Sequence, residues 1–562
     1  MSTTGIYGLS GSGIDVDSMV KVGMMSKQSQ YDKMYKETVK NEWMKSAYAD
    51  LYSEVNTFNQ STLSTYKMSS TTSPMTAEST STGVATATAN ADAASMSHVV
   101  TVKSLASNAY LQSGDKGITR SVKNSDGTAS TSIKLSDIFY NGTDTYDPNS
   151  EDTALAFTIS DGTGTSGKSA TISFTYKEIF GNGVTLNDLA SKIKSSGVNI
   201  QASYDSVNDS FSLYQKTGGL ENVISLDTTK DADGKAISSD AAKNAQTLLT
   251  NLNLYQVKTS TDTSGNTTQK LSDSALSFDS TNTSQTVSGT DGKVTIDGKS
   301  YDTTSSKITV GNVSYTLGGV GTTTVSVAQD TDKVIENVKK FVEDYNKMID
   351  SLNSKYYETQ YSDYGVLTKS QESSMTQDQI TKWNEKAKSG LLYHDKTVGK
   401  IVSAMREALY TPVEGTGSNY NTMMSLGITS STDQGHIKLD ETKLKKALAA
   451  DPDCVRNVFS ASGTVTNADG TTSTDYDKEG VMNRISDALY TNLKSLKSYA
   501  GDSSETADGS TLGDLIETLK TKMSDFKTQM TAFENALYDK YDAMESAIQQ
   551  LSVQLGYITG GN

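Results

Sequence analysis

Histidine and cysteine supply many of the nucleophiles, bases and metal ligands of proteins, and this chain of 562 residues has very few of them. Its three histidines, His98, His394 and His436, are far apart in sequence, and its one cysteine is Cys454. Neither a CxxC nor an HExxH pattern lies near them, so the spacing of zinc ligands is missing. The pairing of a nucleophile with a base also lacks its parts. We therefore expect no catalytic, cofactor-binding or metal-binding residues.

The other residues with chemical potential have a structural explanation. Cys454 lies in an apolar pattern with Val455 and Phe459, which favours a small buried thiol over a reactive one. Asp440 precedes a helical pattern and can cap its backbone amides. The glycine-rich stretch 8–15 lacks the Lys-Ser/Thr pair of a phosphate-binding loop. Carboxylates are plentiful but form no evident acid and base pair, so an enzyme stays only as an alternative that a hydrolase screen would check.

Polar and acidic residues dominate the composition. The formal net charge is -16, whereas nucleic-acid affinity depends on clustered Lys and Arg, so we expect no nucleic-acid partner. The 35% of apolar residues and the mean hydropathy of -0.47 indicate a thin, well-solvated architecture. No run approaches the roughly 20 apolar residues of a membrane span, and no apolar signal segment precedes Lys21. We expect a soluble protein without membrane insertion.

A long apolar seam occupies the C-terminus, from Leu512 to Ile558. Its members are Leu512, Ile516, Leu519, Met523, Phe526, Met530, Phe533, Leu537, Tyr541, Met544, Ile548, Leu551, Leu555 and Ile558. Their steps alternate four and three, the rhythm of a coiled coil, with one stutter between Leu537 and Tyr541. A helix with so narrow a seam needs a partner helix from this chain or from a neighbour.

A second seam lies near the N-terminus and is the obvious partner. It comprises Met44, Tyr48, Leu51, Val55 and Phe58. Upstream, Val20, Met24, Tyr31 and Met34 keep the rhythm, and Lys27 stands where an apolar residue is expected. Core helices of a bundle would explain both seams, but their length favours an elongated assembly element.

The seams provide the candidate site of this chain, an assembly or coiled-coil interface. We assign to it Met44, Tyr48, Leu51, Val55, Phe58, Leu519, Met523, Phe526, Met530, Phe533, Leu537, Met544, Ile548 and Leu551. Within this set we expect Met44, Leu51, Val55 and Phe58, together with Phe526, Met530, Phe533 and Leu537, to carry the docking of the terminal helices.

Between the seams, short alternating runs rich in Thr, Ser and Gly replace the helical period from about residue 78 to 330. We expect strands at 84–88, 99–105, 155–159, 170–176, 200–204, 211–214, 294–296, 308–310, 313–317 and 323–327, with turns at Asp291-Gly292 and Asp297-Gly298. Helices are expected at 186–195, 241–252, from 332, from Thr376 to Gly390, at 395–410 and after Asp440.

These elements predict a multidomain α+β protein, in which terminal coiled-coil helices and a helical core domain enclose inserted antiparallel β domains. The division is 1–43, an N-terminal helical leg that is partly disordered; 44–77 plus 328–510, the helical core; 78–230, a first β domain; 231–327, a second β segment; and 511–562, a C-terminal coiled-coil leg. The fold of about 230–290 stays open.

Several stretches resemble one family, the flagellar hook-associated protein 2 or filament cap family. The opening Gly8-Leu9-Ser10-Gly11-Ser12-Gly13-Ile14-Asp15 is similar to its N-terminal signature, and 97–106 to its first β-domain strand. The return through 323–346 is similar as well. The clearest likeness joins Gly365-Val366-Leu367 with 383–392, followed by 426–428, 435–440 and 443–444. The segment after Met25 departs from the family because it lacks a proline and an acidic residue often seen there.

The resemblance implies a cap at the distal tip of the flagellar filament. Such proteins are secreted by the flagellar type III machinery, form homo-oligomeric rings, often pentamers, and help flagellin to polymerise while preventing its leakage. Implied partners are flagellin, the hook-filament junction proteins and a type III export chaperone. No cofactor or covalent chemistry is implied.

Two alternatives remain from the sequence. A tip-located adhesin could use the Thr/Ser-rich β segments to bind mucin or a host surface. A different axial component, such as a hook-filament junction protein, is disfavoured by the β insertion and the stretch 383–392.

Overall fold

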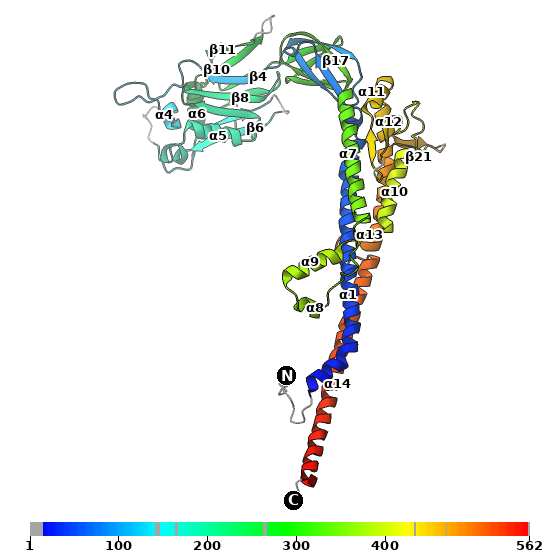
Figure 1. Ribbon diagram of the computed structural model, residues 1–562. Helices are drawn as coiled ribbons and strands as arrows, with labels where there is room; N and C mark the ends of the chain where they lie inside the picture. Colours follow the sequence, from blue (N-terminus) through cyan, green and yellow to red (C-terminus); the bar gives the residue numbers. More distant parts are fainter. Residues whose placement is uncertain are drawn as a thin grey trace. The chain divides into compact units, whose positions relative to one another are not determined.

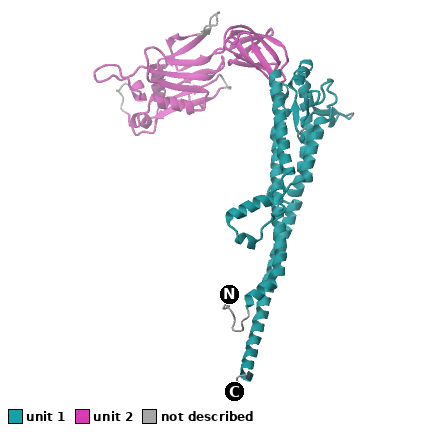
Figure 2. Ribbon diagram, in the orientation of Figure 1, with its two compact units in different colours: residues 1–74, 330–562 teal, residues 75–329 magenta. Residues whose placement is uncertain are grey.

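The structure is a computed structural model that describes residues 15–140, 146–162, 167–261, 267–431, 434–467 and 469–559. The expectations for 1–14 and for the last three residues lie outside the described residues. The chain forms two compact units, one of residues 1–74 and 330–562 and one of residues 75–329 (Figure 2). The chain leaves and re-enters the first unit at neighbouring points, because the amide of Asp330 donates to the carbonyl of Pro74 at 2.9 Å.

The first unit is mainly helical (Figure 1). Its helices are α1 (Val16–Thr57), which continues through a π-helical segment (Phe58–Leu63), α2 (Ser64–Lys67), α3 (Ser69–Thr72), α7 (Thr331–Tyr356), α8 (Lys369–Ser373), α9 (Gln377–Lys388), α10 (Lys396–Tyr410), α11 (Glu441–Ala450), α12 (Cys454–Ser460), α13 (Val481–Ala500) and α14 (Thr511–Thr559). Two hairpins accompany them, β18 (Ile428–Ser430) with β19 (Ile437–Leu439), and β20 (Ser462–Thr466) with β21 (Thr472–Glu479).

Capping side chains set where several helices begin. The carboxylate of Asp15 accepts from the amide of Ser18 at 3.0 Å and starts α1. Thr376 forms the predicted capping box with Gln379 at the start of α9. The carboxylate of Asp440 accepts from the amide of Lys443 and starts α11, so its predicted role as a cap is confirmed. Each cap satisfies backbone amides that have no partner within the helix.

One hydrophobic core holds the first unit together. It joins Leu51 and Val55 of α1 to α7, α10 and α13, with Phe341, Ile401 and Leu489 as fully buried members. The helix α13 has no counterpart among the predicted elements, although its apolar spacing of four and three from Val481 onward resembles that of the seams.

A buried arginine organises one end of this core. Arg484 is 1% exposed, and its guanidinium donates to the backbone carbonyls of Thr411, Pro412, Tyr476 and Asp477 at 2.7 to 2.9 Å. The guanidinium also lies 4.9 Å from the centre of the Tyr476 ring. This one side chain therefore ties the β20–β21 hairpin to the segment that follows α10.

We expect Arg484→Met to lower the free energy of unfolding by about 2 to 3 kcal/mol, because it leaves buried carbonyl groups without donors. Chemical denaturation monitored by circular dichroism would measure the change. Arg456→Met is the matched control, since the Arg456 side chain is 40% exposed and pairs with Asp453 within its own helix; its effect should stay below about 0.5 kcal/mol. Equal losses in the two variants would contradict the role assigned to Arg484.

The second unit is built from antiparallel strands and three short helices. The strands are β1 (Met75–Ser79), β2 (Ala85–Ala89), β3 (Ser97–Ser104), β4 (Asn108–Ser113), β5 (Thr153–Ser160), β6 (Ser169–Thr175), β7 (Ile200–Asp205), β8 (Ser210–Gly218), β9 (Val223–Asp227), β10 (Leu254–Thr261), β11 (Thr267–Ala275), β12 (Ser284–Ser288), β13 (Gly292–Ile296), β14 (Lys299–Thr303), β15 (Lys307–Val310), β16 (Val313–Leu317) and β17 (Gly321–Gln329). The helices are α4 (Leu135–Phe139), α5 (Leu186–Ser195) and α6 (Ser239–Asn251). Each of the predicted strands and both predicted helices are present, and the α+β class is confirmed.

The described strands of this unit form four sheets around two hydrophobic clusters. The sheet orders are β1-β17-β3-β13-β14, β11-β10-β4-β8-β7, β12-β9-β5-β6 and β15-β16-β2. One cluster gathers apolar side chains between residues 109 and 287, and the other joins residues 85–102 to residues 294–327. The predicted join at residue 230 therefore falls inside one cluster, since Leu226 and Leu248 are members of it together. The five-part division of the chain stays a prediction.

One of the two predicted turns is a hairpin turn and the other is not. Asp297 and Gly298 have φ of 48° and 82° and connect β13 to β14, a turn for which Asp-Gly is well suited. Asp291-Gly292 instead leads into β13, so the prediction of a turn there was wrong. Gly292 is required by close packing, because an added Cβ would lie 2.6 Å from the amide nitrogen of Ala106.

Candidate assembly site on the terminal helices

The two terminal helices, α1 and α14, lie side by side and run antiparallel (Figure 1). The hydroxyl of Thr38 lies 3.2 Å from the sulfur of Met523, whereas Asp17, earlier in α1, accepts from the hydroxyl of Tyr538, later in α14, at 3.1 Å. Each step back along α1 thus corresponds to a step forward along α14. The chain itself supplies the partner helix that the C-terminal seam requires.

Close packing and charge hold this helix pair in register. Gly23 lies against Leu537, and a Cβ on that glycine would come 2.7 Å from a methyl carbon of the leucine. Lys520 pairs with Glu42 across the helices at 2.9 Å. Glycine at this point lets the backbone of α1 approach the side chain of α14 more closely than another residue would allow.

Lys27, the irregular position of the N-terminal seam, has a specific place in the helix pair. Its ammonium lies 5.5 Å from the centre of the Phe526 ring and 5.7 Å from that of Phe533. A cation over aromatic faces is attracted by their negative quadrupole. Lys27 thus joins the seam through its charge, which a hydrophobic pattern does not reveal.

The candidate residues of the N-terminal seam belong to the core of the first unit. Tyr48, Leu51, Val55 and Phe58 are buried in it, and Met44 packs against it. The hydroxyl of Tyr48 also donates to Asp395 at 2.7 Å. These residues support the helical core around α7, α10 and α13.

The candidate residues of the C-terminal seam become more exposed toward the chain end. Leu519 is buried; Met523, Phe526, Met530, Leu537, Met544 and Ile548 are half-buried; Phe533 and Leu551 are exposed. Because the helices are antiparallel, Phe526 to Leu537 lie beside the first two turns to four turns of α1 and not beside Met44 to Phe58. The expectation that these two sets act together as one docking surface is therefore corrected, although whether either set mediates assembly stays a prediction.

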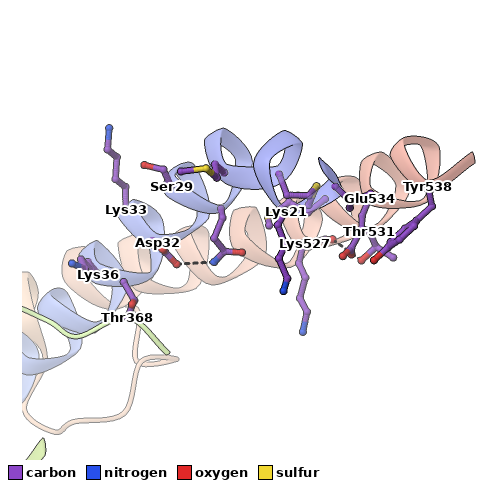
Figure 3. Close-up of a pocket in the computed structure, with 15 residues that line it drawn as sticks. Lys21, Ser29, Asp32, Lys33, Lys36, Thr368, Lys527, Thr531, Glu534 and Tyr538 are labelled. Carbon is purple, nitrogen blue, oxygen red and sulfur yellow. Dashed lines mark hydrogen bonds between the residues drawn. The ribbon is translucent and has the colours of Figure 1, made fainter. Parts of the chain in front are cut away.

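A groove of about 870 Å³ follows the α1–α14 pair on one face (Figure 3). Its apolar lining is Val20, Met24, Met25 and Met530, its lysines are Lys21, Lys33, Lys36 and Lys527, and its carboxylates are Asp32 and Glu534. Gln28 donates to Asp32 at 2.8 Å along its edge. In a chain whose net charge is strongly negative, this groove is locally basic.

The upper end of α14 is fixed by a buried lysine that sequence reasoning missed. The Lys45 side chain is fully buried, and its ammonium contacts the carbonyl of Ala500 at 2.7 Å, a carboxylate oxygen of Asp508 at 2.6 Å and the hydroxyl of Ser510 at 3.0 Å. Gly501 lies so close that a Cβ there would stand 2.8 Å from this ammonium. Lys45 of α1 thereby holds the end of α13 and the start of α14 together.

Burial raises the pKa of Asp508, but hydrogen bonds from Lys45 and Ser510 outweigh it and lower the pKa to about 2. The carboxylate is therefore charged throughout the physiological range. A lysine in a helical run gives no sign that it is buried, so the only usable signal was its place one residue after a seam position.

Two stretches that carry the family resemblance contact each other beside α1. The indole nitrogen of Trp383 in α9 donates to the carbonyl of Gly365 at 2.7 Å, and the ring of Tyr364 lies 4.6 Å from that of Trp383. Lys388, near the end of α9, lies 5.2 Å from the centre of the Trp43 ring of α1. The α8–α9 segment is thus attached to the terminal helix by aromatic and cation–π contacts.

The residues with chemical potential are separate and structurally occupied. Cys454 is buried, and burial raises the pKa of its thiol to about 12, as expected for an unreactive cysteine. His98 contacts Asp297 and His436 contacts Asp350, at 2.7 and 2.6 Å. Within the described ranges, no group of three or more His, Cys, Asp or Glu could hold a metal ion, and no helix there is long and apolar enough to span a membrane.

Comparisons with known proteins identify relatives at both ends of the chain. A family model described as the flagellar hook-associated protein 2 N-terminus matches residues 12–109, and one described as the C-terminus of the same protein matches residues 289–553. The flagellar hook-associated protein 2 of Halalkalibacterium halodurans is 31% identical over 214 residues, which are 36% of this chain and 40% of that protein. The match thus spans less than half the length of that relative.

Solved structures with a similar arrangement are more distant. The D1-D2-D3 domains of the flagellar cap protein FliD from Escherichia coli are 18% identical, with a TM-score of 0.46 and coverage of 80% of this chain and 95% of that chain. FliD from Pseudomonas aeruginosa is 17% identical, with a TM-score of 0.25 and coverage of 50% and 99%. The assignment to a family rests on the two family models. Since these match more than half of the chain, the chain belongs to the flagellar hook-associated protein 2 family.

Proposed function

We propose that this protein is the cap of the flagellar filament at its distal tip, where it promotes flagellin polymerisation and prevents flagellin leakage. The observation that carries the proposal is the match of both ends of the chain to one flagellar family. None of the matched families or relatives is named for an enzymatic activity. The protein acts by binding and positioning other subunits, without covalent chemistry.

The cap would be a secreted ring of identical subunits, a homopentamer, exported through the flagellum. Its partners are flagellin, the hook-filament junction proteins and a type III export chaperone. The terminal helices support this proposal physically, since isolated helices are only marginally stable and gain stability by association. A half-buried seam along α14 leaves apolar surface that neighbouring subunits can cover.

The comparisons give no support to the alternative of a tip-located adhesin, because the relatives are named for flagellar hook-associated or cap proteins. No contact in the described residues favours a mucin or host ligand. We do not develop that alternative further.

Deletion of the gene in its motile host is expected to release monomeric flagellin into the culture supernatant and to leave filaments short or absent. Immunoblotting of the supernatant and electron microscopy of the cells would measure both effects. Complementation with the intact gene is the control, and it should restore filament length. Normal filaments in the deletion strain would show that the cap proposal is wrong.

A further inference from the structure

The helix α14 continues well beyond the start of α1. The register places Tyr538 beside Asp17, at the beginning of α1. From Tyr538, α14 runs on to Thr559, a further length of about 30 Å at about 1.5 Å per residue. Figure 1 shows this red end of α14 extending past α1 toward the C-terminus.

This extension, residues 544–559, carries an apolar stripe that is exposed to solvent. Met544, Ile548, Leu551 and Ile558 are spaced by four, three and seven, which places them on one face of the helix. Leu551 is 63% exposed and Ile558 is 78% exposed. Leaving large apolar side chains in water forgoes free energy that burial would supply, so this face is suited to contact with another helix.

The groove on the α1–α14 pair matches the stripe in length. Its lining on α1 extends from Lys21 to Lys36, about 22 Å along the helix axis at about 1.5 Å per residue. The stripe from Met544 to Ile558 covers about 21 Å on the same basis. Two packed helices offer a third helix a groove in which the ridges of its side chains can lie.

The two surfaces are also complementary in charge. The groove presents four lysines against the carboxylates of Asp32 and Glu534. The segment that leads into the stripe contains Asp539, Asp542 and Glu545 against Lys540. Opposite charges at the rim of an interface favour the correct partner and orientation.

We propose that the exposed stripe of α14 in one copy docks into the α1–α14 groove of a second copy of this chain. The stripe cannot reach the groove of its own chain, since α14 is one uninterrupted helix from Thr511 to Thr559. Leu551 and its neighbours then pack on the methionine lining of the groove, and methionine adapts readily to a helical partner. The inference deepens the self-assembly of the proposed function and rests on it.

Cross-linking between two differently tagged full-length chains tests the proposal. One chain carries Met25→Cys in the groove and the other Leu551→Cys in the stripe, and both keep the buried Cys454. After mixing and treatment with a short bis-maleimide, we expect a heterodimer that contains both tags. The matched control replaces Met25→Cys by Gln30→Cys, because Gln30 is exposed on α1 and does not line the groove.

We expect at least about tenfold more heterodimer with Met25→Cys than with Gln30→Cys, the ratio produced by a docking preference of about 1.4 kcal/mol. Lys21→Glu with Lys527→Glu should reduce the yield, while circular dichroism stays unchanged. Equal yields for the two cysteines, or a protein that stays monomeric by light scattering, would overturn the proposal. A variant with both glutamates that loses the cross-link yet still restores filaments to the deletion strain would separate this docking from the cap function.

Discussion

Replacing both Phe526 and Phe533 with serine is expected to abolish the ability of the gene to restore filaments to a deletion strain. Each ring contacts Lys27 of α1, and the two lie at the middle of the α1–α14 pair. Removing a half-buried phenylalanine costs about 1 kcal/mol of burial, and the loss of each cation–π contact adds about 0.5 to 1 kcal/mol. The helix pair would separate below this level, while residues 75–329, which form their own clusters, keep their fold.

Flagellin in the culture supernatant and filament length by electron microscopy are the measurements for the double variant. Leu515→Ser is the matched control: Leu515 is an apolar residue of the same helix, 42% exposed and outside the seam, so it should restore filaments as the intact gene does. Circular dichroism of the purified variant would show that strand content is retained. Normal filaments from the double variant would refute a role of these rings in assembly.

Elements that depend on local rules could be predicted from the sequence. The helix α9 follows from Thr376 and Gln379, whose side chains cap its first turn, and α5 follows from Thr185 and its apolar spacing. The predicted strands follow from alternation of apolar and polar residues, since one face of each sheet is buried. In these cases the residues that decide the structure are neighbours in the chain.

The misses depend on contacts between distant residues. Lys27 and Lys45 look like solvated charges in a helical run, and only the partners Phe526 and Asp508, several hundred positions away, give them their roles. The pairing level of the two seams was also missed, because a four and three rhythm fits an antiparallel partner at many offsets. For the candidate assembly site, the pattern thus predicted which faces are apolar but not what each face contacts.

Replacing Lys45 with methionine is expected to be the most destabilising single change in the helical unit. The ammonium is fully buried among Ala500, Asp508 and Ser510, and methionine keeps the apolar stem while it removes the charge. Breaking a buried ion pair by removing one partner costs about 3 to 5 kcal/mol, because the other charge loses its compensation. Denaturant titration would measure the loss, and limited proteolysis should cut between α13 and α14, where the connection is released.

The double variant Lys45→Met with Asp508→Asn separates the ion pair from general damage to the core. Removing both charges leaves no uncompensated carboxylate, so we expect the double variant to be more stable than Lys45→Met alone, with a coupling energy of about 1 to 3 kcal/mol. If the effects of the two substitutions simply add, the pair makes no specific contribution and the interpretation of Lys45 as the anchor of α14 fails.

Acidification provides an independent test of the same pair. The pKa of Asp508 is about 2 in the folded protein against an ordinary value of 3.8, since hydrogen bonds from Lys45 and Ser510 outweigh the opposing effect of burial. A lowered carboxyl pKa contributes stability that is complete above its unfolded value and is lost as the pH falls through the folded value. The intact protein should therefore lose stability between about pH 4 and pH 2, and Asp508→Asn should lose less over that range. Parallel pH profiles for the two proteins would mean that the contact between Lys45 and Asp508 does not stabilise the junction of α13 and α14.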